Sequence, residues 1–171
     1  MSIRPILLVA GLLAAGRAGV AQQPQRPAQP LTEHRRLEFF VGTWTLDSLE
    51  PGTTYRETCE WFAGGFHVVC RSERRSPTGT SRGLSILGYA PEEQAYTYYG
   101  IDSSGRTEPL RGRYEGGRWV FTGETRSGGR VTRSRATIEP TPNGFRFTAE
   151  EATDGAPWQT AWRGKYLRLG S

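Results

Sequence analysis

Two cysteines are the first residues whose spacing suggests chemistry. Cys59 and Cys70 lie symmetrically about Gly64 and Gly65, so a hairpin that turns there places them opposite each other. We therefore predict a cross-strand disulfide, as expected in an oxidising compartment. If the two residues form a hydrogen-bonded pair, their Cα atoms lie about 5.5 Å apart, which still permits the bridge. A redox-active or metal-binding pair is the alternative, but neither C-x-x-C spacing nor a histidine cluster accompanies them.

Few other side chains are candidates for acid, base or ligand. Glu108, Glu124 and Glu150 lie in the middle of expected strands, and one that points inward would be desolvated and acquire a raised pKa. The simpler interpretation is an exterior with Glu–Arg cross-strand pairs. We expect His34 to be packed and hydrogen-bonded, and His67 to be exposed beside a turn. Because the common hydrolase, zinc and phosphate-loop motifs are absent, we assign no catalytic residue, no metal ligand and no cofactor.

Aromatic residues form the third group, and most of them share one parity within their strands. They either line a cavity that suits an apolar ligand or simply fill the core. On the first interpretation, the ligand-lining residues are Trp44, Trp61, Tyr96, Tyr98, Trp119, Phe121, Phe147 and Trp162.

The elements that position these groups are short strands. Glycine-rich turn signals recur at nearly even intervals and indicate about ten strands, mostly of 8 to 12 residues, with no room for βαβ crossovers. Because an open meander would leave two exposed edges, we predict an all-β fold, a closed up-and-down antiparallel barrel. The signals lie at residues 51–53, 63–65, 77–79, 91–93, 103–105, 115–117, 127–129, 141–144 and 153–157.

One short helix is expected before the barrel. Thr32 is the predicted cap, Gly42 the predicted end, and His34, Leu37 and Val41 share one face. A helix of about ten residues is unstable alone in water, so it must dock on the barrel and cover one end.

The first 21 residues have the charged, apolar and small-residue order of a secretory signal peptide. Residues 22–31 form a Pro/Gln-rich linker, and residues 32–171 form the single barrel domain. We expect an exported protein, periplasmic or secreted, with no transmembrane span after cleavage. Cys59, the first cysteine, is too far from the apolar run to be a lipidation site.

The basic composition does not indicate a nucleic-acid partner. Removing residues 1–21 removes two arginines, so the formal net charge falls from +5 to +3. Arginine and acidic residues then alternate along the chain without a basic block. An outer-membrane barrel is disfavoured because Arg130 and Arg133 put charge on both faces of one strand.

The order of several segments resembles a known family. These are EHRRLEFFVGTWTL at 33–46, WFAGGF at 61–66, LGYAPEEQAYTYYGID at 87–102, RWVFTGE at 118–124 and WRGKYLRL at 162–169. Helix, G-x-W and strand are how lipocalin-like (calycin) barrels begin, with Trp44 in the position that plugs one end. The whole run resembles a bacterial domain of unknown function, number fifteen seventy-nine. The resemblance implies a lipocalin-like barrel, often secreted, and transfers no catalytic residue.

Nitrobindin-like haem binders open with a similar G-x-W but hold iron through a histidine near the C-terminus. The last strand here, residues 158–169, contains no histidine. Tyr166 has a phenolic oxygen that is able in principle to ligate haem iron, but packing or a hydrogen bond at the rim is the simpler role for it.

Three functions remain open at this stage. The first is a carrier of a small apolar or amphipathic ligand, with the helix as a lid. The second is an isomerase or dehydratase that uses an inward glutamate, and the third is a ligand-free envelope protein that acts through its surface. An apolar cavity would favour the first, a cavity with a desolvated carboxylate the second, and a filled barrel the third. The sequence does not settle the oligomeric state.

Overall fold

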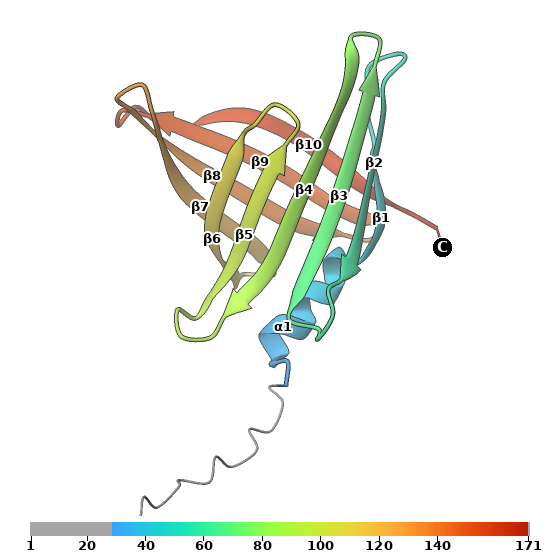
Figure 1. Ribbon diagram of the computed structural model, residues 1–171, viewed down its shortest axis with the longest axis vertical. Coiled ribbons are helices and arrows are strands. Elements are labelled where there is room, and N and C mark those ends of the chain that lie inside the picture. Colours follow the sequence, from blue (N-terminus) through green and yellow to red (C-terminus); the bar gives the residue numbers. More distant parts are fainter. Residues whose placement is uncertain (1–28, 171) are drawn as a thin grey trace, which may run out of the picture.

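The computed structural model describes residues 29–170, and the predicted signal peptide lies outside them. Ten antiparallel strands follow one another around a closed barrel, and β1 pairs with β10 to close it (Figure 1). This confirms the predicted fold class. The strands are β1 (Gly42–Leu46), β2 (Thr54–Trp61), β3 (His67–Ser76), β4 (Gly79–Ala90), β5 (Ala95–Asp102), β6 (Thr107–Glu115), β7 (Arg118–Ser127), β8 (Arg130–Thr141), β9 (Gly144–Thr153) and β10 (Gln159–Leu169).

The connections between strands fall where the sequence predicts turns. Each of the predicted turn segments overlaps the connection between two consecutive strands. Gly64 and Gly65, in the β2–β3 hairpin, have φ angles of 96° and 74°, a region that residues with a Cβ rarely adopt. The hairpins therefore set a register in which one face of each strand turns inward.

The alternation of side chains is clearest in β8. Ser134, Ala136 and Ile138 are buried and point into the barrel, whereas Arg133 on the same strand is exposed. Such a strand has one packed and one solvated face, which is typical of an antiparallel sheet closed around a core.

The predicted helix exists but differs in form. It consists of α1 (Thr32–Arg36) and a 3-10 turn, η1 (Leu37–Phe40). The cap prediction is wrong: Leu31, not Thr32, occupies the N-cap, and its side chain makes no capping hydrogen bond. Burial explains the tighter second turn, because it brings Leu37 and Phe40, which are 0% and 5% exposed, into the end of the barrel.

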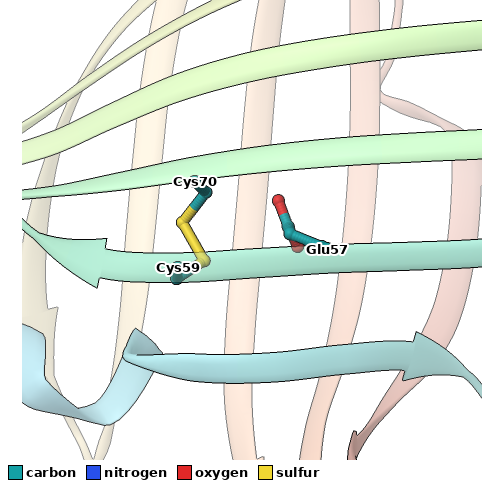
Figure 2. A group of neighbouring side chains, drawn as sticks. All are labelled: Glu57, Cys59 and Cys70. Atoms are coloured by element: carbon teal, nitrogen blue, oxygen red, sulfur yellow. A yellow bond between two sulfur atoms is a disulfide. The ribbon is translucent and has the colours of Figure 1, made fainter.

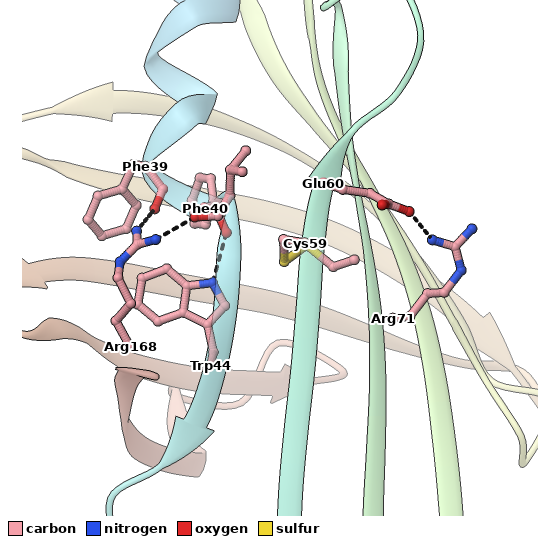
Figure 3. Close-up of a disulfide and its surroundings, with 9 residues drawn as sticks. Phe39, Phe40, Trp44, Cys59, Glu60, Arg71 and Arg168 are labelled. Carbon is pink, nitrogen blue, oxygen red and sulfur yellow. Dashed lines mark hydrogen bonds and ion pairs between the residues drawn. A yellow bond between two sulfur atoms is a disulfide. The ribbon is translucent and has the colours of Figure 1, made fainter. Parts of the chain in front are cut away.

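The helix closes one end of the barrel through a compact set of contacts (Figure 3). Trp44 Nε1 donates a hydrogen bond to the Phe40 carbonyl oxygen at 2.8 Å. The Arg168 guanidinium lies over the Trp44 ring and donates hydrogen bonds to the carbonyl oxygens of Phe39 and Val41. Trp44 therefore plugs this end, as the resemblance to lipocalin-like barrels implies.

The helix end also contains the β2–β3 and β4–β5 hairpins, whereas the β3–β4 hairpin lies at the opposite end (Figure 1). Within residues 29–170, no helix has the length and apolar character needed to cross a membrane.

Candidate functional site

A cavity of about 260 Å³ lies inside the barrel. Its lining begins at the helix end with Phe40 and Trp44. At the other end it reaches two exposed residues, Asp102 at the end of β5 and Arg106 in the β5–β6 connection. The cavity therefore has a closed floor and reaches the surface opposite the helix. A filled barrel, which the third functional hypothesis required, is not what these residues form.

The floor of the cavity is apolar. Besides the two aromatic residues of the plug, it contains Leu87, Ile138 and Phe145, each at most 7% exposed. Burying such side chains is the main favourable contribution to folding. The faces of these side chains that border the cavity give it an apolar floor.

The disulfide borders this floor. Cys59 and Cys70 are bonded to each other and occupy directly opposite positions on β2 and β3, which confirms the predicted pair. Their Cα atoms are 4.0 Å apart, the spacing of a non-hydrogen-bonded pair, so the hydrogen-bonded geometry considered from the sequence does not apply.

A polar layer lies above the floor. Strand parity turns Tyr55 and Glu57 inward from the same strand as Cys59, and the register places Ser72 opposite Glu57. Three further inward positions on β4, β5 and β10 add hydroxyl groups to the same cavity; they are Ser85, Tyr98 and Tyr166.

Small residues keep space open around this layer. Gly83 lies opposite both Ser72 and Asp102 in the sheet, so one inward position there has no side chain. Gly100 leaves room for the Tyr98 ring, because a Cβ at this position would lie 2.7 Å from the Tyr98 hydroxyl oxygen. The cavity thus depends on glycine at inward positions of β4 and β5, and not on the width of the barrel alone.

Glu57 is the carboxylate that the barrel surrounds. Burial raises its pKa to about 7, and hydrogen bonding with the Tyr55 hydroxyl opposes part of that increase. At neutral pH both protonation states are therefore populated, so this group can accept or donate a proton.

Three tyrosines surround the carboxylate. Burial, together with the charges of Glu108 and Glu57, raises the pKa of Tyr98 to about 12. Burial and nearby Glu57 also raise the pKa values of Tyr55 and Tyr166. These hydroxyls stay protonated over the whole neutral range and remain able to donate hydrogen bonds into the cavity.

Glu57 also lies beside the disulfide on the inner face of β2 and β3 (Figure 2). One carboxylate oxygen and the two sulfur atoms are all within 4.8 Å of one another. A zinc-type site needs deprotonated thiolates and usually four ligands. With the two sulfurs joined, this group offers one carboxylate, which is too few.

The mouth of the cavity is charged. Arg106 Nη2 lies 3.2 Å from a Glu108 carboxylate oxygen and 3.6 Å from one of Glu151. Asp102 accepts hydrogen bonds from the Ser104 hydroxyl and from the backbone N–H groups of Ser104 and Arg106. These bonds lower the Asp102 pKa, with the Ser104 hydroxyl as the largest cause.

The aromatic residues proposed from the sequence as ligand-lining separate into three groups. Trp44, Tyr98 and Phe147 line the cavity. Tyr96, Trp119 and Phe121 are at most 2% exposed and lie in the core away from the lining. Trp61 and Trp162 form the third group, outside the lining and the buried core. Trp61 is partly buried and donates a hydrogen bond to Glu38. Trp162 is 37% exposed and packs on Phe147 and Tyr166.

The three candidate inward glutamates also differ in position. Glu108 lines the cavity near its mouth. Glu124 and Glu150 instead form outer ion pairs with Arg126 and Arg135, at 2.7 and 2.8 Å. The Glu150–Arg135 pair joins β9 to β8, as the simpler interpretation expected, whereas Glu124 and Arg126 lie on the same strand, β7.

Sequence reasoning missed Glu57. The available signal was parity: Tyr55, Glu57 and Cys59 alternate with Arg56, Thr58 and Glu60. A disulfide buried on the inner face of the barrel fixes the inward parity of β2, and this parity turns Glu57 inward as well.

The histidines are where the sequence placed them. His34 is 4% exposed, and its Nδ1 accepts a hydrogen bond from the Leu31 backbone N–H at 3.1 Å. Desolvation and the nearby His67 lower its pKa. His67 is exposed at the start of β3, and neither residue is part of the cavity lining.

The fold indicates the class, and comparison with known proteins identifies the family. The closed barrel with an interior cavity and a tryptophan plug is consistent with the lipocalin-like class. Residues 29–168 match the family described as "Protein of unknown function (DUF1579)", and the chain belongs to that family. No curated protein matches the sequence.

Proposed function

We propose that the barrel binds a small amphipathic molecule, apolar end first, in the cavity between the helix plug and the β5–β6 mouth. The observation that supports this proposal is the order of the lining residues along the barrel axis, from the helix end to the mouth. An apolar floor lies beneath a layer with one desolvated carboxylate and several hydroxyl groups. Binding pockets typically combine an apolar wall with a few polar groups that fix orientation.

The volume limits the size of the molecule. A cavity of about 260 Å³ is slightly smaller than the roughly 300–1,000 Å³ typical of drug-sized ligands. It would hold on the order of ten water molecules. The proposed ligand is therefore compact, about the size of one or two fused rings with a short polar arm.

The ligand enters opposite the helix. The hydrogen bonds of Arg168 and Trp44 to the carbonyl groups of η1 and Val41 hold the helix on the barrel. These contacts favour a fixed plug over a moving lid. The mouth near Asp102 and Arg106 then becomes the proposed route.

The test is native mass spectrometry with organic extraction of the exported protein, followed by titration with a fluorescent apolar probe. A stoichiometric adduct or saturable probe uptake supports the proposal. The variant Ser85→Phe places a ring in the cavity and should abolish uptake. Ser81→Phe, on the exposed part of the same strand, is the control and should leave uptake unchanged. Equal uptake by both variants would place the probe outside the barrel.

A second function is favoured by one observation, the Glu57 pKa of about 7 beside hydroxyl donors. In this alternative, Glu57 removes a proton from carbon next to a carbonyl group and returns it to another position. Tyr98 donates a hydrogen bond to the carbonyl oxygen as negative charge develops there. Proton nuclear magnetic resonance of phenylacetone in D₂O tests it. Exchange must be faster with wild-type protein than with Glu57→Gln, and equal rates reject it.

We further propose that the chain is exported. The order of residues 1–21 and the Cys59–Cys70 bond support this. The mass of protein recovered from a bacterial periplasm should correspond to a chain that begins at Gln22 and has two hydrogens fewer than the reduced form. Retention of residues 1–21 would contradict it.

A further inference from the structure

The charges that line the cavity are unequal. Three carboxylates, Glu57, Asp102 and Glu108, face one guanidinium, that of Arg106. A cavity with this balance attracts cations and disfavours anions, and the low-dielectric barrel wall strengthens the effect.

The single cationic side chain of the lining is already engaged at the mouth. Arg106 lies between Glu108 and Glu151, both on the exposed side of the polar layer. Asp102 is likewise engaged at the mouth, because its Oδ1 accepts three hydrogen bonds from its own turn. The charged groups at the mouth therefore already interact with neighbouring groups of the mouth.

Glu57 differs from these groups. Among the ion pairs of residues 29–170, none involves Glu57. Its neighbours are the Tyr55 hydroxyl, Ser72 and the disulfide. Glu57 is half-buried, and a partly desolvated carboxylate without a counter-ion is costly, so a cation that enters the cavity reduces a penalty that the fold otherwise bears.

Aromatic rings near Glu57 contribute less to the choice of head group. Tyr55 and Tyr166 pack edge to face at 5.8 Å, and Tyr166 stacks on Phe145 at 4.4 Å, so these rings already contact one another. Arg168 lies over the Trp44 ring at 4.2 Å. The Glu57 carboxylate, and not a cation–π contact, therefore accounts for the preference for a cation.

We infer that the cavity selects a compact primary amine, with the ammonium group bound to the Glu57 carboxylate and the apolar body on the floor formed by Phe40, Leu87 and Phe145. This inference rests on the proposed ligand-binding function and narrows it to one chemical class. It assigns Glu57 as the residue that determines head-group specificity.

The inference has a defined pH dependence. An ammonium group binds the ionised carboxylate, so affinity for an amine rises as pH increases through the Glu57 pKa of about 7. The gain persists until the amine itself loses its proton. The tyrosines stay protonated over this range and do not reverse the trend. The charged and titratable groups that face Glu57 across the cavity are Tyr55, Tyr98, Tyr166, Asp102, Arg106 and Glu108.

The test is isothermal titration calorimetry, which measures the affinity of the full chain for three probes that share a phenyl body. These are 2-phenylethylamine, 2-phenylethanol and 3-phenylpropanoic acid, which end in a cation, a neutral hydroxyl and an anion. At pH 8 the amine should bind about tenfold or more tightly than the alcohol, the usual size of a charged hydrogen bond's contribution. The acid should bind most weakly.

Two variants assign the effect to Glu57. Glu57→Gln keeps the shape and hydrogen-bonding capacity of the side chain, so it should remove the preference for the amine and leave alcohol binding intact. Glu60→Gln, on the outer face of the same strand, should behave like wild type.

The outcomes separate the two proposals. Equal binding of amine and alcohol, or an amine preference that survives Glu57→Gln, overturns the inference while ligand binding in the barrel stands. If the alcohol binds and Ser85→Phe does not weaken it, the probes bind elsewhere and the inference also fails. Failure of all three probes, together with no uptake of the fluorescent probe, overturns the binding function itself.

Discussion

The helix end and the middle of the barrel interior use similar residues to different effect. At the helix end, aromatic rings contact one another, and the Trp44 N–H and Arg168 guanidinium have backbone acceptors. In the middle, Tyr55 and Tyr166 also contact each other, but together with Glu57 they border a cavity of about 260 Å³. The first region stabilises the fold, and the second retains a desolvated acid. The packed plug and the candidate site thus occupy neighbouring parts of one core.

The largest expected effect is at the plug. Trp44→Ala removes a side chain that is 1% exposed, together with its hydrogen bond to Phe40. We expect a loss of about 3–5 kcal/mol in the free energy of unfolding, measured by urea denaturation. Trp162→Ala, at a 37% exposed position, is the control and should cost much less. Similar losses for both would mean that the plug contributes no special stability.

The disulfide comes next. Replacing Cys59 and Cys70 together by alanine opens a loop with a sequence separation of 11. We expect a loss of about 2–3 kcal/mol, because the unfolded chain regains conformational freedom. Urea denaturation of the variant and of chemically reduced wild type should agree. A variant as stable as oxidised wild type would show that the hairpin is already constrained by the barrel.

The pH dependence of stability tests whether Glu57 is desolvated. Its folded-state pKa of about 7 lies above its usual value, so between the two values the folded protein binds a proton that the unfolded chain has released. Wild type should therefore lose stability as pH rises from 5 to 8, by about 1–3 kcal/mol relative to Glu57→Gln. Denaturation midpoints at several pH values measure this. Parallel pH profiles for the two proteins would show that Glu57 is well solvated.

The smallest effect is expected on the outer surface. Glu60→Gln breaks an ion pair with Arg71 whose side chains are 64% and 61% exposed (Figure 3). Exposed pairs contribute little, so the free energy of unfolding should change by less than about 0.5 kcal/mol. A loss as large as that of the disulfide variant would contradict the division between inner and outer faces.

Much of the barrel follows from local patterns. Turn residues fix where each strand ends, and alternation fixes that one face is packed, so strand number and order were predictable. The Cys59–Cys70 pair was predictable for the same reason, since a two-glycine turn sets the register of its own hairpin. Helix capping was not, because docking of Leu37 and Phe40 overrides the local preference of Thr32.

The site was only partly predictable. Glu57 lies in a strand whose charged residues fall on both alternating faces, so nothing marked it as inward-facing. Glu108, Glu124 and Glu150 were instead the candidates for an inward glutamate. Alternation says that two faces exist, but it does not say which of them is inside. That choice depends on packing of the whole barrel.

The sequence by itself determined the ten strands, their connections and the disulfide, because turns and hairpin registers involve residues that are near one another in the chain. Tertiary structure decided which aromatic rings fill the core and which border a cavity. It also brought Glu57 of β2 together with Tyr98 of β5 and Tyr166 of β10. Those contacts exist only once β1 and β10 close the barrel, since closure sets the width of the interior.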